Sequence, residues 1–274
     1  MLVLTDEHVG GASSWEKGIW RPSAEFLASV NPADGSLSKE KGRLSWLAEE
    51  KDKGIWIFDL KPLTIYRVKC RRIKEEKKPQ NVSAGWENLY LLVEVVEREL
   101  RNELLEEVLE EYKKPVVITD ELCGSFELER AYNWFYAKVD WLGTTCRVSL
   151  ECDDEDGVTA EGALAAFREI YANVEEWDEK FRTFAAQKLT GLANEWQDED
   201  MDEEDDDIDG DGGEESSGSI TKESFAKRIS ISEFTIDADG AYTAYYEDDD
   251  MFYGHVILID GSIEDGMKSA DIAG

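Results

Sequence analysis

The stretch NWFYAKVDWLGTTCRVSLECDD, residues 133–154, decides the fold class of the second half of the chain. Phe135, Ala137, Val139 and Trp141 stand at every second position of its first part. Successive side chains of a β-strand point to opposite faces of a sheet, so these four residues share one apolar face. Together with the preceding SFELERAY, this alternation predicts paired strands that cover a core with one face.

The apolar period changes after this stretch, which predicts helices. From Thr159 onward, apolar side chains recur every three or four residues instead of every second one. Asn173, with Glu176 three residues later, matches a capping box and predicts a break between two helices. The segment ITKESFAKRIS, residues 220–230, predicts a third helix capped by Thr221. Three strand-like runs then close the chain: ISEFTID, AYTAYYE and MFYGHVILID.

The first half of the chain predicts a smaller, β-rich domain. Residues 1–52 are rich in Gly, Ser and Pro, which predicts turns and short pieces. A helical segment follows the strands of this half and stops before Pro115, where we place the domain boundary. The strand-like runs of this half are GIWIFDL (54–60), LTIYRVKCRRI (63–73) and NLYLLVEVVE (88–97).

The expected fold class is therefore α+β in two domains. Residues 1–115 form a small, barrel-like β domain that ends in a helix. Residues 116–274 form an acidic domain in which an antiparallel sheet packs against two or three helices. At 274 residues, the chain is long enough for two cores of ordinary size.

The charge of the chain is concentrated in the second domain. Residues 1–115 hold 19 Lys and Arg against 21 Asp and Glu, whereas residues 116–274 hold 11 against 42. The net charges are therefore −2 and −31, and a field of this sign repels nucleic acid and membrane surfaces and attracts basic proteins. Solubility alone is the alternative explanation of the charge.

The location and redox state follow from composition. The N-terminus has no basic start, and the longest apolar runs are far too short to cross a bilayer, so we expect neither a signal peptide nor a membrane span. The four cysteines are scattered without a CxxC pair, which is typical of reduced thiols in a cytoplasmic protein.

One acidic segment partly matches a calcium-binding loop. The segment 198–219 is predicted to be a disordered acidic loop between helices. Within it, DDDIDGDGGEES (205–216) places aspartates and Gly210 where an EF-hand loop needs ligands and a sharp turn, but Ser216 stands where the bidentate Glu belongs. A disordered linker and a calcium site both remain open, and the candidate ligands are Asp205, Asp207, Asp209 and Asp211.

A second candidate site lies near the C-terminus, in DDDMFYGHVILID. Asp248, Asp249 and Asp250 precede His255, one of only two histidines in the chain. Apolar residues on both faces of MFYGHVILID predict a central strand that carries His255 as a packing residue, with the three aspartates as its solvent-facing turn. The alternative is a metal or acid–base site built from the aspartates and His255.

A basic strand in the first half raises the question of nucleic acid. In RVKCRRIKEEKK (67–78), basic side chains alternate with Val68 and Cys70, which predicts a half-buried strand with a basic outer face. A small β-barrel with such a face could bind nucleic acid. The acidic second domain argues against this partner.

The function that the sequence favours is protein binding. The chain has no GxSxG, P-loop, HExxH or GxGxxG motif, and we expect no cofactor. We expect a non-catalytic module for a basic protein partner, in one version an immunity-type inhibitor of a nuclease toxin. A metal-dependent hydrolase that uses the aspartate cluster with His255 and a calcium-responsive module built on 205–216 remain the alternatives. Nothing in the sequence fixes the oligomeric state.

Several segments of the second half also carry a family resemblance. They are FELERAYNWFYAKVDW, EEWDEKFRTFAAQKLTGLANEW, ITKESFAKRI and, the most specific, DDDMFYGHVILIDGSIEDGMKSADIAG. Over about residues 116–274 the chain resembles the uncharacterised bacterial family named domain of unknown function 2262, and the first half resembles a second uncharacterised domain ahead of it. The resemblance implies a cytoplasmic bacterial protein and supplies no activity, cofactor or site residue.

Overall fold

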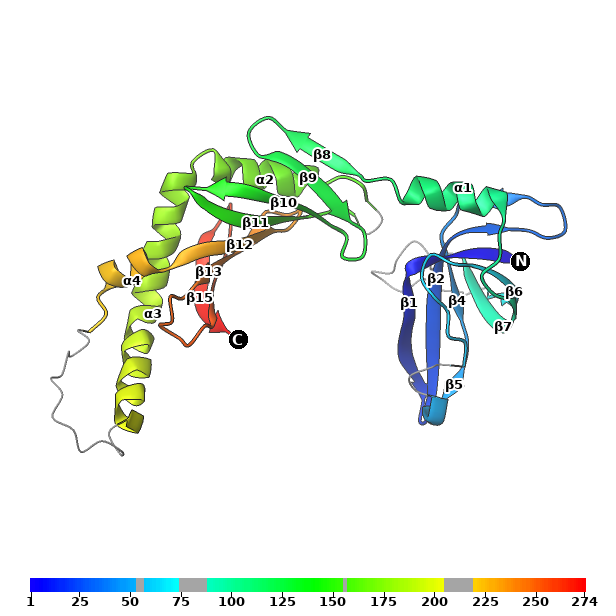
Figure 1. Ribbon diagram of the computed structural model, residues 1–274, viewed down its shortest axis with the longest axis horizontal. Helices are drawn as coiled ribbons and strands as arrows, with labels where there is room; N and C mark the ends of the chain where they lie inside the picture. Colours follow the sequence, from blue (N-terminus) through cyan, green and yellow to red (C-terminus); the bar gives the residue numbers. More distant parts are fainter. Residues whose placement is uncertain (53–56, 74–87, 155–156, 205–218) are drawn as a thin grey trace. The chain divides into compact units, whose positions relative to one another are not determined.

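The structure is a computed structural model, and it describes residues 1–52, 57–73, 88–154, 157–204 and 219–274 (Figure 1). For His8 and residues 198–204 only the backbone is described. The chain divides into two compact units, Met1–Pro115 and Val116–Gly274, which we call unit 1 and unit 2.

Unit 1 is built around a closed barrel of five strands. Neighbouring strands pair in the cyclic order β1-β2-β4-β7-β6-β1, in which β4 and β7 are parallel and every other pair is antiparallel. This order is that of the OB-fold barrel, and a fold alone does not assign a function. The barrel strands are β1 (Leu2–Glu16), β2 (Ile19–Val30), β4 (Gly42–Ser45), β6 (Ile65–Arg72) and β7 (Leu89–Glu97), and β3 (Leu37–Ser38), β5 (Ala48–Glu49) and the 3-10 helix η1 (Glu50–Asp52) are additions.

The alternation predicted for β6 is confirmed. Tyr66 and Val68 are buried in the barrel, whereas Arg67 and Lys69 lie on its outer surface. There Arg67 pairs with Glu97 at 3.0 Å and Lys69 with Glu94 at 3.8 Å, and both acids belong to β7. The basic face of β6 is therefore partly neutralised by its neighbouring strand.

Helix α1 (Glu103–Tyr112) lies across the end of the barrel opposite the tip of the β1–β2 hairpin (Figure 1). The Asn102 side chain caps it by accepting from the Leu105 backbone N–H at 3.2 Å. Leu105 is fully buried against apolar residues of β1, β2 and β6. The Tyr112 hydroxyl donates to the buried Asp6 carboxylate at 3.1 Å, which ties the end of the helix to β1.

Two expectations for unit 1 are wrong in part. The short pieces expected over residues 1–52 are formed after Val30, as β3, β4, β5 and η1. Before Val30 the chain instead forms the long β1–β2 hairpin, because Gly10 at φ 105 and several register shifts accommodate the glycines of β1 as bulges. The strand expected at 54–60 is not formed over 57–60, where Ile57 has φ 70, a value that no strand residue adopts. The rest of that run lies outside the described residues.

Unit 2 contains one sheet of eight strands, built as two antiparallel four-stranded meanders (Figure 1). The meanders join through a parallel pairing of β11 with β12. The α+β fold class is confirmed, and this parallel pair is the one departure from the expected antiparallel sheet. It arises because three helices intervene between the paired strands and form a crossover. In spatial order the strands are β15 (Gly266–Ala273), β14 (Val256–Ser262), β13 (Ala241–Glu247), β12 (Ser230–Ile236), β11 (Thr144–Glu151), β10 (Trp134–Trp141), β9 (Gly124–Glu129) and β8 (Val117–Asp120).

The three helices of unit 2 are α2 (Glu161–Tyr171), α3 (Val174–Glu204) and α4 (Lys222–Arg228). The break expected near Asn173 is confirmed, although its side chain donates to the Glu169 carbonyl at 3.2 Å at the end of α2. Thr221 caps α4 as expected, in a reciprocal pair with Ser224. Helix α3 continues to Glu204, into the segment expected to be disordered, and residues 205–218 lie outside the described residues.

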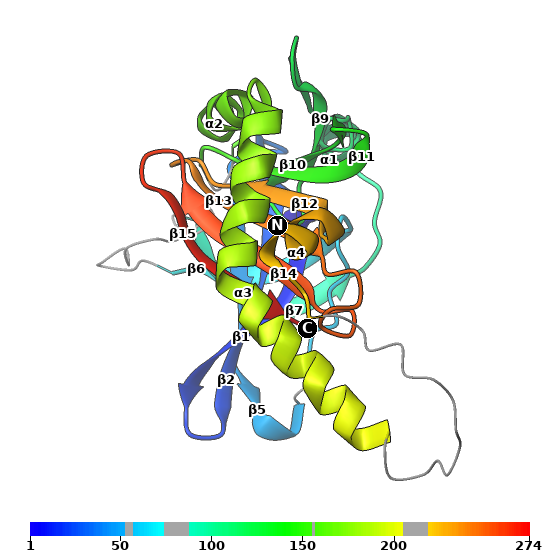
Figure 2. The same ribbon diagram turned by 90° about the vertical axis from the view of Figure 1, so that its left-hand side faces the viewer.

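One face of the sheet forms the core of unit 2. Val148, Phe234, Ala244 and Ile259 stand opposite one another on neighbouring strands, and all are buried. Helices α2 and α3 cover this face, since Phe167 of α2 and Phe181 of α3 both contact Phe234. Figure 2 shows α3 crossing the sheet strands. Among the described residues, no helix is long and apolar enough to cross a membrane.

A buried carboxylate fixes α3 on the sheet. Asp178 accepts from the Trp141 indole N–H at 3.0 Å and from the Tyr246 hydroxyl at 2.8 Å. It also pairs with Arg182, one helical turn later, at 2.5 Å. The Arg182 guanidinium in turn donates to the carbonyls of Ala226 and Ile229. Burial, with the Asp178 charge as a second cause, raises the pKa of Tyr246 well above its ordinary value.

Helix α3 offers a matched pair of variants that tests this network. Asp178→Asn removes the ion pair of the Arg182 guanidinium, whose side chain is 25% exposed, and turns an amide toward it, so we expect a loss of about 1–3 kcal/mol in the free energy of unfolding. Glu176→Gln breaks the exposed Glu176–Lys180 pair of the same helix, whose side chains are 66% and 47% exposed, and should cost about 0.5 kcal/mol or less. Urea denaturation measures both, and equal losses would contradict the role given to Asp178.

The raised pKa of Tyr246 gives stability a specific pH dependence. Tyrosine in an unfolded chain has a pKa of about 10. Below this pH, the folded and the unfolded state both keep the phenol proton, and the contribution of Tyr246 to stability is fully present. Above this pH, the unfolded state loses the phenol proton first, which favours unfolding. The free energy of unfolding of wild type should therefore fall by about 1.4 kcal/mol per pH unit more than that of Tyr246→Phe, which has no phenol to titrate. We therefore expect the variant to be less stable by about 1–2 kcal/mol at about pH 8, with the gap narrowing at about pH 11. A gap that stays constant in urea denaturation would show that Tyr246 does not titrate as inferred.

Candidate functional site

The candidate site is the connection between β13 and β14, residues 248–255, which we call the Asp248 turn. The strand expected over 251–260 begins only at Val256, and His255 lies outside it. Asp249, Asp250 and Tyr253 have φ of 51, 59 and 56 degrees, so this segment cannot be extended. Nor is β14 covered equally on both faces, because Ile257 and Ile259 are fully buried while Val256, Leu258 and Asp260 on the other face are only half-buried.

Asp248 is a buried structural residue, which corrects the expectation of a solvent-facing aspartate. Its side chain is buried at the end of β13. The carboxylate accepts from the backbone N–H groups of Phe252 at 2.6 Å, and of Asp250 and Gly254 at 3.3 Å. One side chain thus satisfies three donors of the turn and fixes its shape.

The other two aspartates differ in their surroundings. Arg228, the last residue of α4, pairs through Nε with the Asp249 carboxylate at 2.6 Å and donates to the Asp249 carbonyl at 2.6 Å. Asp250 is exposed. The three consecutive acids therefore do not converge: one faces inward, one binds a guanidinium and one faces solvent.

His255 belongs to an aromatic cluster around Trp196 of α3. Its Nδ1 lies 2.6 Å from the Phe252 carbonyl, which can only accept, so Nδ1 carries the proton and donates. The imidazole meets the Trp196 ring edge-on at 5.4 Å, and Phe252 does the same at 5.5 Å. As a half-buried packing residue, His255 keeps its expected role, although at the end of a turn and not on a strand.

Tyr253 is the exposed member of this cluster. Its ring stacks on Trp196 at 5.4 Å with an interplanar angle of 23 degrees, and its hydroxyl donates to the Trp196 carbonyl at 3.0 Å. The side chain nevertheless remains 57% exposed. A left-handed conformation costs a bulky residue about 1–2 kcal/mol, and the surrounding contacts hold Tyr253 in it.

The expected metal ligands do not assemble in the described part of the chain. Within residues 1–52, 57–73, 88–154, 157–204 and 219–274, no group of three or more His, Cys, Asp or Glu is placed to hold a metal ion. Asp205, Asp207, Asp209 and Asp211 lie outside the described residues, so the calcium loop stays a prediction.

The cysteines offer no reactive thiolate. All four are free thiols, and Cys123, Cys146 and Cys152 are buried. Burial raises the pKa of the Cys123 and Cys146 thiols to about 12 and that of Cys152 to about 11. These three thiols are therefore protonated at neutral pH and are poor nucleophiles.

Sequence reasoning missed the residues that shape the Asp248 turn. Trp196 and Tyr253 are 57 residues apart in the sequence, so no local pattern relates them. Arg228 binds Asp249, which is 21 residues later in the chain, and no local sequence pattern predicts this contact. The available signal was Gly254, since an isolated glycine inside an apparent strand indicates an interruption such as a bulge or a close backbone approach.

Two isosteric substitutions separate the roles of the aspartates. Asp248→Asn replaces one acceptor oxygen with a donor that faces backbone N–H groups, so we expect a loss of about 1–3 kcal/mol in the free energy of unfolding. Asp250→Asn, two residues away and exposed, should change it by about 0.5 kcal/mol or less. Urea denaturation at neutral pH provides the comparison, and a large effect at Asp250 alone would reverse our assignment.

Comparison with known families assigns both halves of the chain. The family model described as Uncharacterized protein conserved in bacteria (DUF2262) matches residues 120–272, as the sequence resemblance implied. A model described as Domain of unknown function (DUF7021) matches residues 1–112. No curated protein and no solved structure gives a significant match.

Proposed function

The chain belongs to the bacterial family DUF2262, and we propose that it binds a positively charged protein partner through the Asp248 turn of unit 2. The observation that carries this proposal is Tyr253, an aromatic residue held exposed in a left-handed conformation by its neighbours. Strained residues that the fold holds in place are concentrated at functional sites.

The turn has the composition of a binding hot spot. Tyrosine combines a large apolar ring with a polar hydroxyl, and interface hot spots are enriched in it. Asp248, Arg228 and Trp196 hold the turn before any partner arrives, so little conformational entropy remains to be lost on binding. Asp250, three residues before the tyrosine, adds an exposed carboxylate to the turn.

The charge of unit 2 selects the class of partner. Unit 2 covers residues 116–274, with 11 Lys and Arg against 42 Asp and Glu. A net charge of this size accelerates encounter with a basic surface and repels acidic ones. A basic protein therefore fits better than nucleic acid, and the pairing of Arg67 and Lys69 with β7 glutamates supports the same choice in unit 1.

More specifically, we propose that the chain is an immunity-type inhibitor of a nuclease toxin. A nuclease groove that binds phosphates is basic, so the exposed Asp250 carboxylate on a rigid turn can occupy it in place of a phosphate of the nucleic acid backbone.

The metal-dependent hydrolase remains the second candidate, with less support. It requires Asp248, Asp249 and His255 to share one ligand sphere. Asp248 instead accepts three backbone donors, Asp249 pairs with Arg228, and His255 donates to the Phe252 carbonyl. The calcium-responsive module depends on residues 205–216 and has no support from the described residues.

Site-specific photocrosslinking in the native bacterium tests the proposal. We expect a photoreactive phenylalanine at position 253 to capture one protein of strongly basic composition, because Tyr253 lies at the centre of the proposed contact. Tyr132 is the matched control: it is also in unit 2 and is 64% exposed, but it lies in the β9–β10 turn. The same label there should not capture that protein.

Affinity measurements with the purified, captured protein complete the test. Tyr253→Ala should weaken binding by about 30-fold or more, whereas Tyr132→Ala should leave it within about twofold. Asp250→Asn should mainly slow association and reduce its salt dependence. Capture of an acidic protein, or equal capture from positions 253 and 132, would refute the proposal.

A further inference from the structure

Unit 1 contains a pocket that the proposed function does not use. It lies beside the tip of the β1–β2 hairpin and has a volume of about 440 Å³, within the range typical of small-molecule sites. Its walls come from three separate places in the chain: the hairpin tip, the segment from Leu47 to Asp52, and Ile57.

The apolar part of the pocket is unusually open to solvent. Trp15, Leu47 and Ile57 are 55%, 52% and 49% exposed, and all three line the same pocket. Single exposed apolar side chains are ordinary, but three around one concave site indicate a ligand surface. Ile19 and the buried Ala48 complete the apolar wall.

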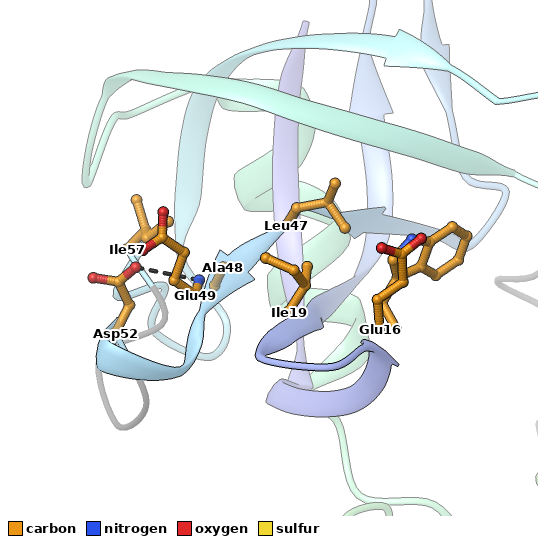
Figure 3. Close-up of a pocket in the computed structure, with 8 residues that line it drawn as sticks. Glu16, Ile19, Leu47, Ala48, Glu49, Asp52 and Ile57 are labelled. Atoms are coloured by element: carbon orange, nitrogen blue, oxygen red, sulfur yellow. Dashed lines mark hydrogen bonds between the residues drawn. The ribbon is translucent and has the colours of Figure 1, made fainter.

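Carboxylates stand at both ends of this apolar wall. Figure 3 shows the Ile19 and Leu47 side chains between Glu16 on one side and Glu49 with Asp52 on the other. Lys51 pairs with Glu49 at 2.8 Å, while the Asp52 carboxylate accepts only weakly, from the Glu49 backbone N–H at 3.3 Å. Among the residues that the structure describes, none pairs with the Glu16 carboxylate. Glu16 and Asp52 are thus the acceptors available to a ligand.

The Trp15 ring of the pocket already contacts a cation of the protein. The Arg21 guanidinium lies 5.3 Å from the centroid of the Trp15 ring, in the geometry of a cation–π contact. Unit 1 as a whole is near neutral, with 19 Lys and Arg against 21 Asp and Glu over residues 1–115. Attraction of a cationic ligand to this pocket therefore has to come from its own carboxylates, Glu16 and Asp52, and not from the net charge of the unit.

We propose that this pocket binds a linear aliphatic diamine, with one ammonium group at Glu16, the other at Asp52, and the alkyl chain along Ile19 and Leu47. Each ammonium gains a charge-assisted hydrogen bond, and the methylene groups cover apolar surface that is otherwise exposed. A monoamine can satisfy only one end. This site is in a different unit from the Asp248 turn, so either proposal can fail without the other.

Nuclear magnetic resonance of the full chain provides a readout confined to the pocket. The probe ligands are 1,5-diaminopentane, n-pentylamine and 1,5-pentanediol, and the signal is the Trp15 indole N–H, assigned through its loss in Trp15→Phe. Diamines that gather loosely on acidic unit 2 do not shift this signal. We expect a saturable shift with 1,5-diaminopentane, affinity at least about tenfold weaker for n-pentylamine, and no shift with the diol.

Two charge-neutralising variants complete the experiment. Glu16→Gln should remove the advantage of the diamine over the monoamine, because one of its two anchors is gone. Glu107→Gln, at an exposed glutamate of α1, should leave both affinities unchanged and shows that the loss is not a general charge effect. Unchanged positions of the other indole signals in each variant verify the fold. Equal binding of diamine and monoamine, absence of a Trp15 shift, or insensitivity to Glu16→Gln would each overturn the proposal.

Discussion

One buried carboxylate connects the two meanders of the unit 2 sheet with helices α3 and α4. Asp178 of α3 accepts from Trp141 in β10 and from Tyr246 in β13, which belong to different meanders of the sheet. Through Arg182 it also reaches the carbonyls of Ala226 and Ile229, at the end of α4. A buried charge is tolerated only when its hydrogen bonds are satisfied, so these partners hold one another in place. The parallel β11–β12 pair, where the meanders meet, lies between the two strands that this carboxylate holds.

The same helix determines the shape of the candidate site. Asp178 and Arg182 fix one part of α3 against the sheet, and four turns later Trp196 receives the stacked ring of Tyr253. Arg228 at the end of α4 holds Asp249, and Tyr246 is only two residues before Asp248 on the chain. The strained turn is therefore held by contacts with α3 and α4 and by its connection to β13. This is the condition under which a left-handed tyrosine can persist.

Local patterns in the sequence predicted the elements well and their long-range pairing poorly. The alternation of Phe135, Val139 and Trp141 correctly identified the inner face of β10, because burial on one face of a strand leaves a period of two. The Thr221 cap and the break near Asn173 follow from equally local hydrogen bonding. The β11–β12 pairing depends on how three helices cross the sheet, and no residue of either strand encodes that path locally.

In the candidate site, too, the sequence identified the local segment but not its long-range contacts. The sequence singled out Asp248, Asp249, Asp250 and His255 as a group, yet their roles differ because each meets a partner from another part of the fold. Identical neighbouring side chains cannot be told apart by composition, and only the backbone of the turn decides which aspartate faces inward. The contacts of Trp196 and Arg228 with the turn were not predicted, because contacts between residues this far apart produce no periodic pattern in the sequence.

Hydrogen exchange measured by mass spectrometry on wild type and Asp178→Asn tests the central claim, that one carboxylate holds both meanders and, through α3, the Asp248 turn. The account predicts faster exchange in the variant at three places together: peptides of β10, peptides of β13, and peptides that contain residues 248–255. Acceleration confined to α3, with the strands and the turn as protected as in wild type, would contradict it.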